Sequence, residues 1–290
     1  MPVDISTVIG TECPSLRAER RGGVLIVVLD DSNTKFNTFT WQRLEDLALV
    51  MRLLRRDTSV RSVLLTGNGR FFSAGGSFEV FESLRHNEGA ERGGMLCHQL
   101  YDDLLAVPAP IVCALNGPAI GVGCSIALLS DVVFASSTAT LSDPHVSRGV
   151  TAGDSPAIWS LYIGPVRAKR YLLTGEVISA DEAKALGMYT FVYPAAEVFD
   201  RALEYATDFA AGAPNAIAHT KALCNRYIKE SIDRSFDVGF GLEVLDFRSD
   251  DHREAMAAFR EHRQPHFGSS NGDRRDPENP KTGDRQTDAV

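Results

Sequence analysis

Hydrophobic and polar residues follow two different periods along this chain. Short runs rich in β-branched residues, such as GVLIVVLD at residues 23–30, have the length and composition of buried strands. Residues 40–56 instead carry apolar side chains at helical spacing. The same criteria predict strands at 61–66, 111–115, 132–136 and 139–143, and helices at 92–105 and 120–130. Because strands and helices alternate, this part of the chain predicts an α/β fold with right-handed crossovers.

The pattern becomes mostly helical from residue 166 onward. Residues 1–20 show neither period and are expected to form a loose leader, so the α/β core is placed at 21–210. The polar, Pro/Gly-rich tail 268–290 buries too little apolar surface to offset its ordering entropy and is expected to be disordered. Helices are predicted at 166–173, 180–186, 195–211, 215–229, 232–247 and 250–262, the last three within a helical region 211–267.

The composition is that of a soluble globular protein. The 290 residues are 44% hydrophobic and 23% charged, and the net charge of −8 argues against a nucleic-acid-binding surface. The five cysteines form no CxxC pair, which favours free thiols in a reducing cytoplasm and no metal site. The longest apolar run, 119–129, is too short to span a membrane.

Two glycine-containing loops each follow an apolar strand. The first glycine loop, RFFSAGGSF at 70–78, offers the N–H of Gly76, and the second, NGPAIGVGCSI at 116–126, offers that of Val122. Glycine lets a backbone approach a ligand closely, and two such amides can stabilise one developing oxyanion. The structural alternative is a pair of ordinary strand–helix turns.

These loops, with LLTGEVISADEAKALGM at 172–188 and SDDHREAMAAFREHRQPHF at 249–267, resemble the crotonase superfamily, or enoyl-CoA hydratase/isomerase family, over most of residues 20–267. The resemblance implies a crotonase spiral of ββα units with a helical C-terminal region that makes trimers or hexamers. It also implies an acyl-CoA substrate, with coenzyme A as part of the substrate and no separate cofactor. Gly76 and Val122 match the family's oxyanion-hole positions.

The chain departs from the hydratases of that family at both glutamate positions, which are Ser125 and His145 here. Hydration by two glutamates is therefore not expected. Asp154 follows His145 by nine residues, and a hydrogen-bonded His145–Asp154 dyad would be an oriented general base whose pKa the carboxylate raises. The segment 144–175 resembles the 6-oxocamphor hydrolase branch, whose members cleave β-diketones. The alternative is a structural loop histidine.

Other side chains are candidates by position alone. The candidate pocket residues are Ser125, Ser77, Trp41, Phe39 and Glu243. Core packing explains the aromatic pair equally well, and a solvated helix face is the favoured interpretation of the glutamate. The candidates for contact with CoA phosphates are Lys35, Arg43, Arg70 and Arg263.

Three functions stay open: an acyl-CoA enzyme using His145 and Asp154, a β-diketone hydrolase without CoA, and a catalytically silent binding or assembly protein.

Overall fold

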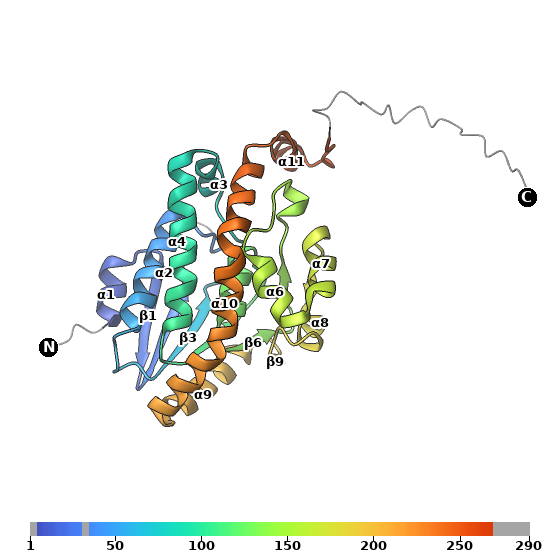
Figure 1. Cartoon of the computed structure of the whole chain (residues 1–290). Helices are drawn as coiled ribbons and strands as arrows, with labels where there is room; N and C mark the ends of the chain where they lie inside the picture. Colours follow the sequence, from blue (N-terminus) through green and yellow to red (C-terminus); the bar gives the residue numbers. More distant parts are fainter. Residues whose placement is uncertain (1–4, 31–34, 269–290) are drawn as a thin grey trace, which may run out of the picture.

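The fold, described for residues 5–30 and 35–268 in a computed structural model, contains two sheets (Figure 1). The larger sheet has the strand order β1-β2-β3-β4-β6-β9, and the smaller has the order β5-β7-β8. The strands are β1 (Leu16–Arg21), β2 (Val24–Leu29), β3 (Ser62–Gly67), β4 (Ile111–Leu115), β5 (Ala119–Ile120), β6 (Val132–Ser136), β7 (Thr140–Ser142), β8 (Ile178–Ser179) and β9 (Phe191–Tyr193).

The larger sheet is parallel except at one edge. β1 pairs antiparallel with β2, whereas β2, β3, β4, β6 and β9 run parallel. β2, VLIVVL, is buried at five of its six positions and half-buried at the other. Continuous apolar strands of this kind are expected where both faces of a parallel sheet are covered.

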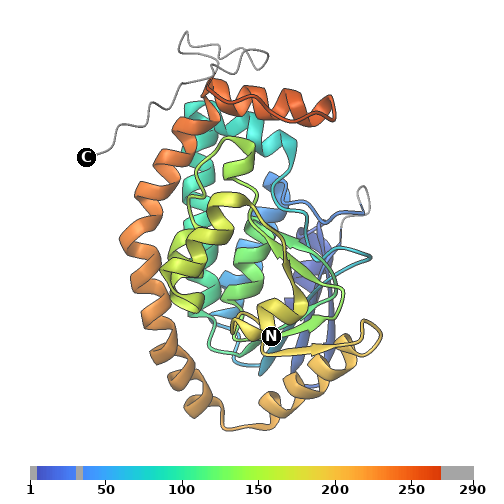
Figure 2. The ribbon, with the colours of Figure 1, turned by 90° about the vertical axis from the view of Figure 1, so that its right-hand side faces the viewer.

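Helices cover both faces of this sheet. α9 packs on one face through Val198, Ala202 and Ala206, and a larger core that includes α2 and α4 fills the other. α10 runs beside α4 and α6 (Figures 1 and 2). The helices are α1 (Ile5–Glu12), α2 (Trp41–Leu54), α3 (Phe78–Leu84), α4 (Asn87–Ala106), α5 (Val122–Leu129), the short 3₁₀ helix η1 (Val146–Arg148), α6 (Ser155–Ile163), α7 (Pro165–Thr174), α8 (Ala180–Ala185), α9 (Val198–Ala211), α10 (Pro214–Phe247) and α11 (Asp250–Arg260).

Local sequence explains where several helices begin and continue. The Thr40 hydroxyl accepts a hydrogen bond from the Arg43 backbone N–H at 3.2 Å and so caps the start of α2. The two helices predicted at 215–229 and 232–247 are one continuous helix, α10. The junction residues Glu230 and Ser231 include neither glycine nor proline, so nothing in the chain interrupts the helix there.

Residues 5–20 correct the expectation of a loose leader. Ile5 and Ile9 of α1 are 3% and 0% exposed, because their spacing of four residues places them on one helix face. β1 then pairs with β2 as the edge strand of the larger sheet. Its composition, LRAERR, is unusual for a strand and hid it from the sequence pattern, although charged side chains are common at sheet edges.

Two expectations about the ends and surface of the chain are limited by what the structure covers. The tail predicted to be disordered lies, apart from Gly268, beyond the described residues. Within 5–30 and 35–268, no helix combines the length and apolar character needed to cross a bilayer.

Candidate active site

The two glycine loops lie side by side. An isolated parallel bridge joins Ser73 of the first loop to Ala119 of the second, and the Ile120 N–H donates to the Ser73 carbonyl at 3.0 Å. Gly75 has φ of +86°, and a side-chain carbon there would stand 3.0 Å from the Ile120 carbonyl oxygen. A residue with a Cβ is therefore disfavoured at Gly75 by both its dihedral angle and the second loop.

Each loop contains a backbone donor, next to an occupied one, that the fold does not use. The Ser77 N–H donates to the Phe39 carbonyl, and the Gly121 N–H donates to the Ser142 carbonyl. In the part of the chain that the structure describes, the Gly76 and Val122 N–H groups donate to no protein acceptor. An oxyanion hole requires two such free donors, and the convergence of these two on one oxygen stays a prediction.

His145 lies against the second glycine loop. It follows β7 and precedes η1, and a side-chain carbon built on Gly121 would stand 3.7 Å from its Cε1. Its Nδ1 contacts Asp143 Oδ1, and its Nε2 lies 3.5 Å from Glu243 Oε1. The Asp143 carboxylate also accepts the His145 backbone N–H at 3.2 Å, so the turn itself orients the imidazole.

The expected His145–Asp154 hydrogen bond is not formed. Asp154 Oδ2 instead accepts hydrogen bonds from the hydroxyls of Tyr101 and Ser125. Asp143, two residues before His145, reaches the imidazole first because the chain turns tightly there. The Ser155 hydroxyl contacts both Asp143 and Asp154, so His145 and Asp154 belong to one buried network without touching.

Glu243 reaches His145 because α10 packs unusually closely on the loop before α6. A Cβ on Gly239 would lie 2.1 Å from the Gly153 carbonyl oxygen, and one on Gly153 would lie 2.3 Å from Glu243 Oε2. Asp246, one turn further along α10, accepts a hydrogen bond from the Thr151 N–H at 2.9 Å. Glu243 is only 7% exposed, so the interpretation of it as part of a solvated helix face is wrong.

The carboxylates around His145 favour its charged form. Burial lowers the pKa of His145, but Asp143 and then Glu243 outweigh burial and hold that pKa well above its ordinary value. Burial raises the pKa of Glu243 despite the nearby imidazole. For Asp143, burial is outweighed by His145 and Ser155, so its pKa is lowered. The two carboxylates therefore favour the imidazolium, which is an acid rather than a base.

These contacts predict which aspartate controls the imidazole. Replacing Asp143 by Asn removes the carboxylate bonded to Nδ1 and should lower the pKa of His145 clearly. Asp154→Asn removes a carboxylate that does not contact the ring, and it should lower the pKa of His145 less. NMR titration of the His145 ring in the two variants measures both effects, and an equal or reversed order would contradict the assignment of Asp143 as its partner.

The remaining candidate pocket residues have structural roles in this fold. The Ser77 hydroxyl caps α3 by accepting the Val80 N–H at 3.3 Å. Phe39 is fully buried and bridges to Gly76, while Trp41 is 7% exposed and stacks beneath the Arg92 guanidinium at 4.7 Å. Both aromatic residues belong to the core, and Phe39 lies beside the first glycine loop.

Two of the four cations proposed for CoA phosphates are already engaged. Arg43 is 1% exposed and donates to the Thr38 carbonyl at 2.6 Å, so it does not reach a ligand at the surface. Arg263 pairs with Glu254 and Glu261. Lys35 and Arg70 stay candidates by position.

The sequence interpretation missed Asp143, Tyr101 and Ser155. Asp143 carries a local signal, because an aspartate two residues before His145 in SDPH is suited to bond the following backbone and ring. Tyr101 gives no such signal, since it appears on α4 as one more apolar helix position.

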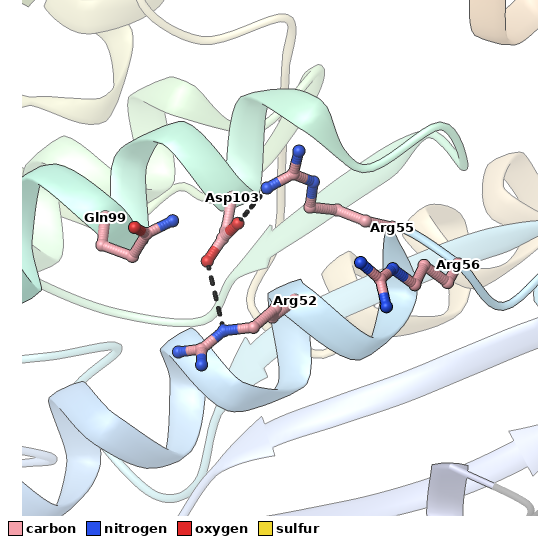
Figure 3. Close-up of a pocket in the computed structure, with 5 residues that line it drawn as sticks. All are labelled: Arg52, Arg55, Arg56, Gln99 and Asp103. Carbon is pink, nitrogen blue, oxygen red and sulfur yellow. Dashed lines mark hydrogen bonds and ion pairs between the residues drawn. The ribbon is translucent and has the colours of Figure 1, made fainter.

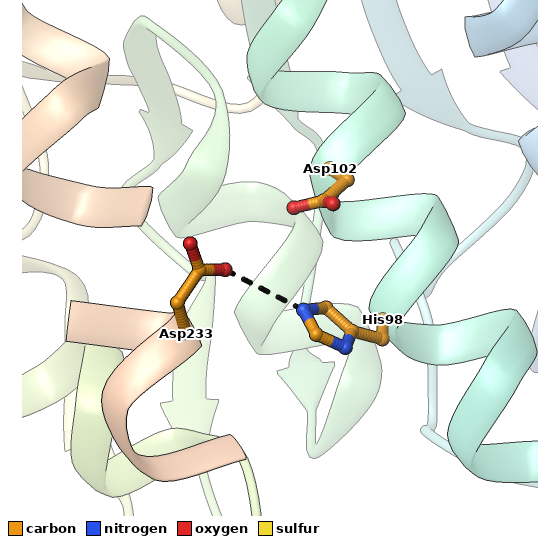
Figure 4. Close-up of side chains that lie close together, drawn as sticks. All are labelled: His98, Asp102 and Asp233. Carbon is orange, nitrogen blue, oxygen red and sulfur yellow. Dashed lines mark ion pairs between the residues drawn. The ribbon is translucent and has the colours of Figure 1, made fainter. Parts of the chain in front are cut away.

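Two other polar clusters lie away from the glycine loops. One is a hollow between α2 and α4 that three arginines line (Figure 3). The other joins His98 and Asp102 of α4 to Asp233 of α10 (Figure 4). Lys229 Nζ lies 2.7 Å from Asp102 and 2.8 Å from Asp233, so this second cluster has its own cation and ties α4 to α10.

Comparison with known proteins agrees with this architecture. The enoyl-CoA hydratase/isomerase family model matches residues 19–270. A short-chain-enoyl-CoA hydratase of Clostridium acetobutylicum is 30% identical over 250 residues, covering 85% of this chain and 94% of that protein. The crystal structure of an enoyl-CoA hydratase/isomerase from Mycobacterium paratuberculosis superposes with a TM-score of 0.80 at 30% identity, covering 85% of this chain and 99% of that one.

A β-diketone hydrolase from the cyanobacterium Anabaena shares the fold with a TM-score of 0.77 at 24% identity, over 82% of this chain and 96% of that one. At that identity the likeness concerns the fold alone. The family match and the hydratase relatives together confirm the predicted crotonase fold: this chain belongs to the enoyl-CoA hydratase/isomerase family of the crotonase superfamily.

Proposed function

We propose that this family member acts on an acyl-CoA thioester and stabilises an enolate-like oxyanion with the N–H groups of Gly76 and Val122. The observation that supports it is the pair of unused amides on adjacent loops, with the half-buried imidazole of His145 against one of them. Preorganised donors aimed at developing negative charge are often the largest single contribution to catalysis. Coenzyme A enters as part of the substrate, and no separate cofactor is invoked.

His145 is the proton-transfer group in this proposal. Its charged form is favoured by Asp143 and Glu243, so the resting imidazolium donates a proton to the substrate and Glu243 is placed to accept one. Asp154 acts at a distance by holding the hydroxyls of Ser125 and Tyr101. In this proposal His145 and Asp154 still act in the same site without a direct hydrogen bond. His145 occupies one glutamate position of the hydratases, and Asp154 holds the hydroxyl of Ser125, which occupies the other.

The second candidate is hydrolysis of a β-diketone without CoA. It is favoured by one observation, the histidine–carboxylate set at a position where the hydratases carry a glutamate. Both reactions pass through an oxyanion that the same amides would stabilise. They differ in the ligand, because only the first needs recognition of the CoA phosphates.

A substrate panel separates the two reactions. We expect acyl-CoA thioesters to raise the melting temperature, with a smaller shift for analogues that lack the CoA phosphates. Crotonyl-CoA hydration should be slow or absent, because Ser125 and His145 replace both glutamates and each acid/base group contributes roughly 10²–10⁴-fold. Turnover of cyclic β-diketones without thioester binding would instead establish the second function. If the protein neither bound nor turned over either class of compound, the catalytically silent alternative would remain.

A trimer or hexamer in the cytoplasm completes the proposal. The outer face of α10 carries exposed large apolar side chains, including Tyr227 at 72% and Val238 at 68%. Such a face is unusual on a monomer and supports assembly through the helical C-terminal region. Sedimentation of the purified chain measures the state directly.

A further inference from the structure

The hollow between α2 and α4 is chemically distinct from the candidate active site. It measures about 450 Å³ and is lined by Arg52, Arg55, Arg56, Gln99 and Asp103 (Figure 3). The glycine-loop contacts of Phe39 lie at the start of α2, whereas the three arginines lie at its end. A helix of 14 residues separates the two places by about 20 Å.

Positive charge is in excess in this hollow. Its three guanidinium groups face a single carboxylate, in a chain whose net charge is −8. Arg55 Nη1 donates to Asp103 Oδ1 at 2.6 Å, which ties α2 to α4. Among the described residues, the Arg56 side chain has no hydrogen bond or ion pair, and Arg52 makes only a long contact to Asp103. A tie between the helices needs one arginine, so the other two are available to a ligand.

The buried carboxylate of Asp103 is a second, independent indication that this hollow binds a ligand. Its side chain is fully buried, and its Oδ2 accepts no hydrogen bond within the described part of the chain. Arg52 Nε is 3.7 Å from this oxygen, beyond hydrogen-bond distance. A buried acceptor without a donor is costly, and Asp103 lines the hollow, so a ligand O–H placed there would satisfy it.

We propose that this hollow binds hydrogen phosphate, either free or as the protonated terminal group of a phosphate ester. The guanidinium groups of Arg52 and Arg56 donate to the phosphate oxygens, since their planar forks match phosphate geometry, and Arg55 adds positive charge beside them. The P–OH group donates to Asp103 Oδ2. A carboxylate among the arginines would repel an anion without such a proton, so the site selects against sulfate.

Calorimetric titration with inorganic phosphate and with sulfate at neutral pH and moderate salt tests this selectivity. We expect phosphate to bind at least roughly tenfold more tightly than sulfate. Arg56→Gln should weaken phosphate binding by about the same factor, because it removes one charge-assisted donor. Arg167→Gln, which removes an exposed arginine on α7, should leave binding unchanged. Equal affinity for the two anions, no phosphate binding, or equal effects of the two variants would overturn the proposal.

Two further experiments distinguish the hydrogen bond from the P–OH proton to Asp103 from general attraction between the arginines and an anion. Asp103→Asn should reduce the preference for phosphate over sulfate, with a melting curve to confirm that the variant is folded. Methyl phosphate loses its last proton near pH 6, so its affinity should fall between about pH 5.5 and about pH 8. Measurable methyl phosphate binding at the lower pH identifies esters as ligands, whereas phosphate binding alone identifies the free anion. A preference that survives Asp103→Asn contradicts the role given to the carboxylate.

Discussion

His145→Ala is expected to lower turnover of the true substrate by roughly 10²–10⁴-fold, the usual contribution of a positioned acid or base. In the proposed mechanism the half-buried imidazole is the proton donor beside the second glycine loop, and the variant leaves Asp143 and Glu243 without it. His219→Ala, which removes an exposed histidine of α10, is the matched control and should have no effect. A His145→Ala enzyme with full turnover would exclude the imidazole from the reaction.

The pH profile decides the direction of proton transfer at His145. Because the neighbouring carboxylates hold its pKa well above the ordinary histidine value, the donor form is expected to persist to higher pH than in a free histidine and to be lost as pH rises through that pKa. Activity should therefore decrease on the alkaline side. His145→Gln keeps a polar side chain that cannot titrate, so any residual activity should lack this decrease. Activity that instead increases through the titration would make His145 a base, as the sequence alone suggests.

Much of the fold could be predicted from the sequence because local pattern and tertiary environment agree. The central strands are continuous apolar runs, and α2 has both a helical period and a Thr40 cap. The prediction failed at β1, whose six residues include four charged ones. An edge strand needs backbone pairing more than an apolar face, so its composition carries little signal.

The candidate site was only partly predictable, since its contacts join distant segments. The backbone positions Gly76 and Val122 are marked by the glycines around them, and His145 by its place in the family pattern. The partner of His145 was misassigned because a suitable spacing to Asp154 does not exclude a nearer carboxylate. Glu243 is about a hundred residues away from His145 in the chain, and only the close packing of α10 brings them together.

The close packing of α10 against Gly153 leads to the second large expected effect, a loss of stability in a glycine variant. Gly239→Ala should destabilise the protein by about 1–3 kcal/mol, because the new Cβ would stand 2.1 Å from the Gly153 carbonyl oxygen and the backbone must move. Gly241→Ala is the matched control on the same helix, since a Cβ there meets nothing within 4 Å. Without a clash, replacing a helical glycine by alanine should stabilise by up to about 1 kcal/mol. Urea unfolding of the two variants measures this opposite response.

The same pair of variants tests whether α10 sets the chemistry of His145. Moving α10 away from Gly153 separates Glu243 from the imidazole, which removes one of the two carboxylates that favour its charged form. The pKa of His145 should therefore decrease in Gly239→Ala and stay unchanged in Gly241→Ala, as read by NMR titration of the ring. The alkaline decrease in activity should begin at lower pH in the first variant only. Destabilisation with an unaltered His145 titration would show that Glu243 stays in place or contributes little, and that Asp143 alone holds the proton on the imidazole.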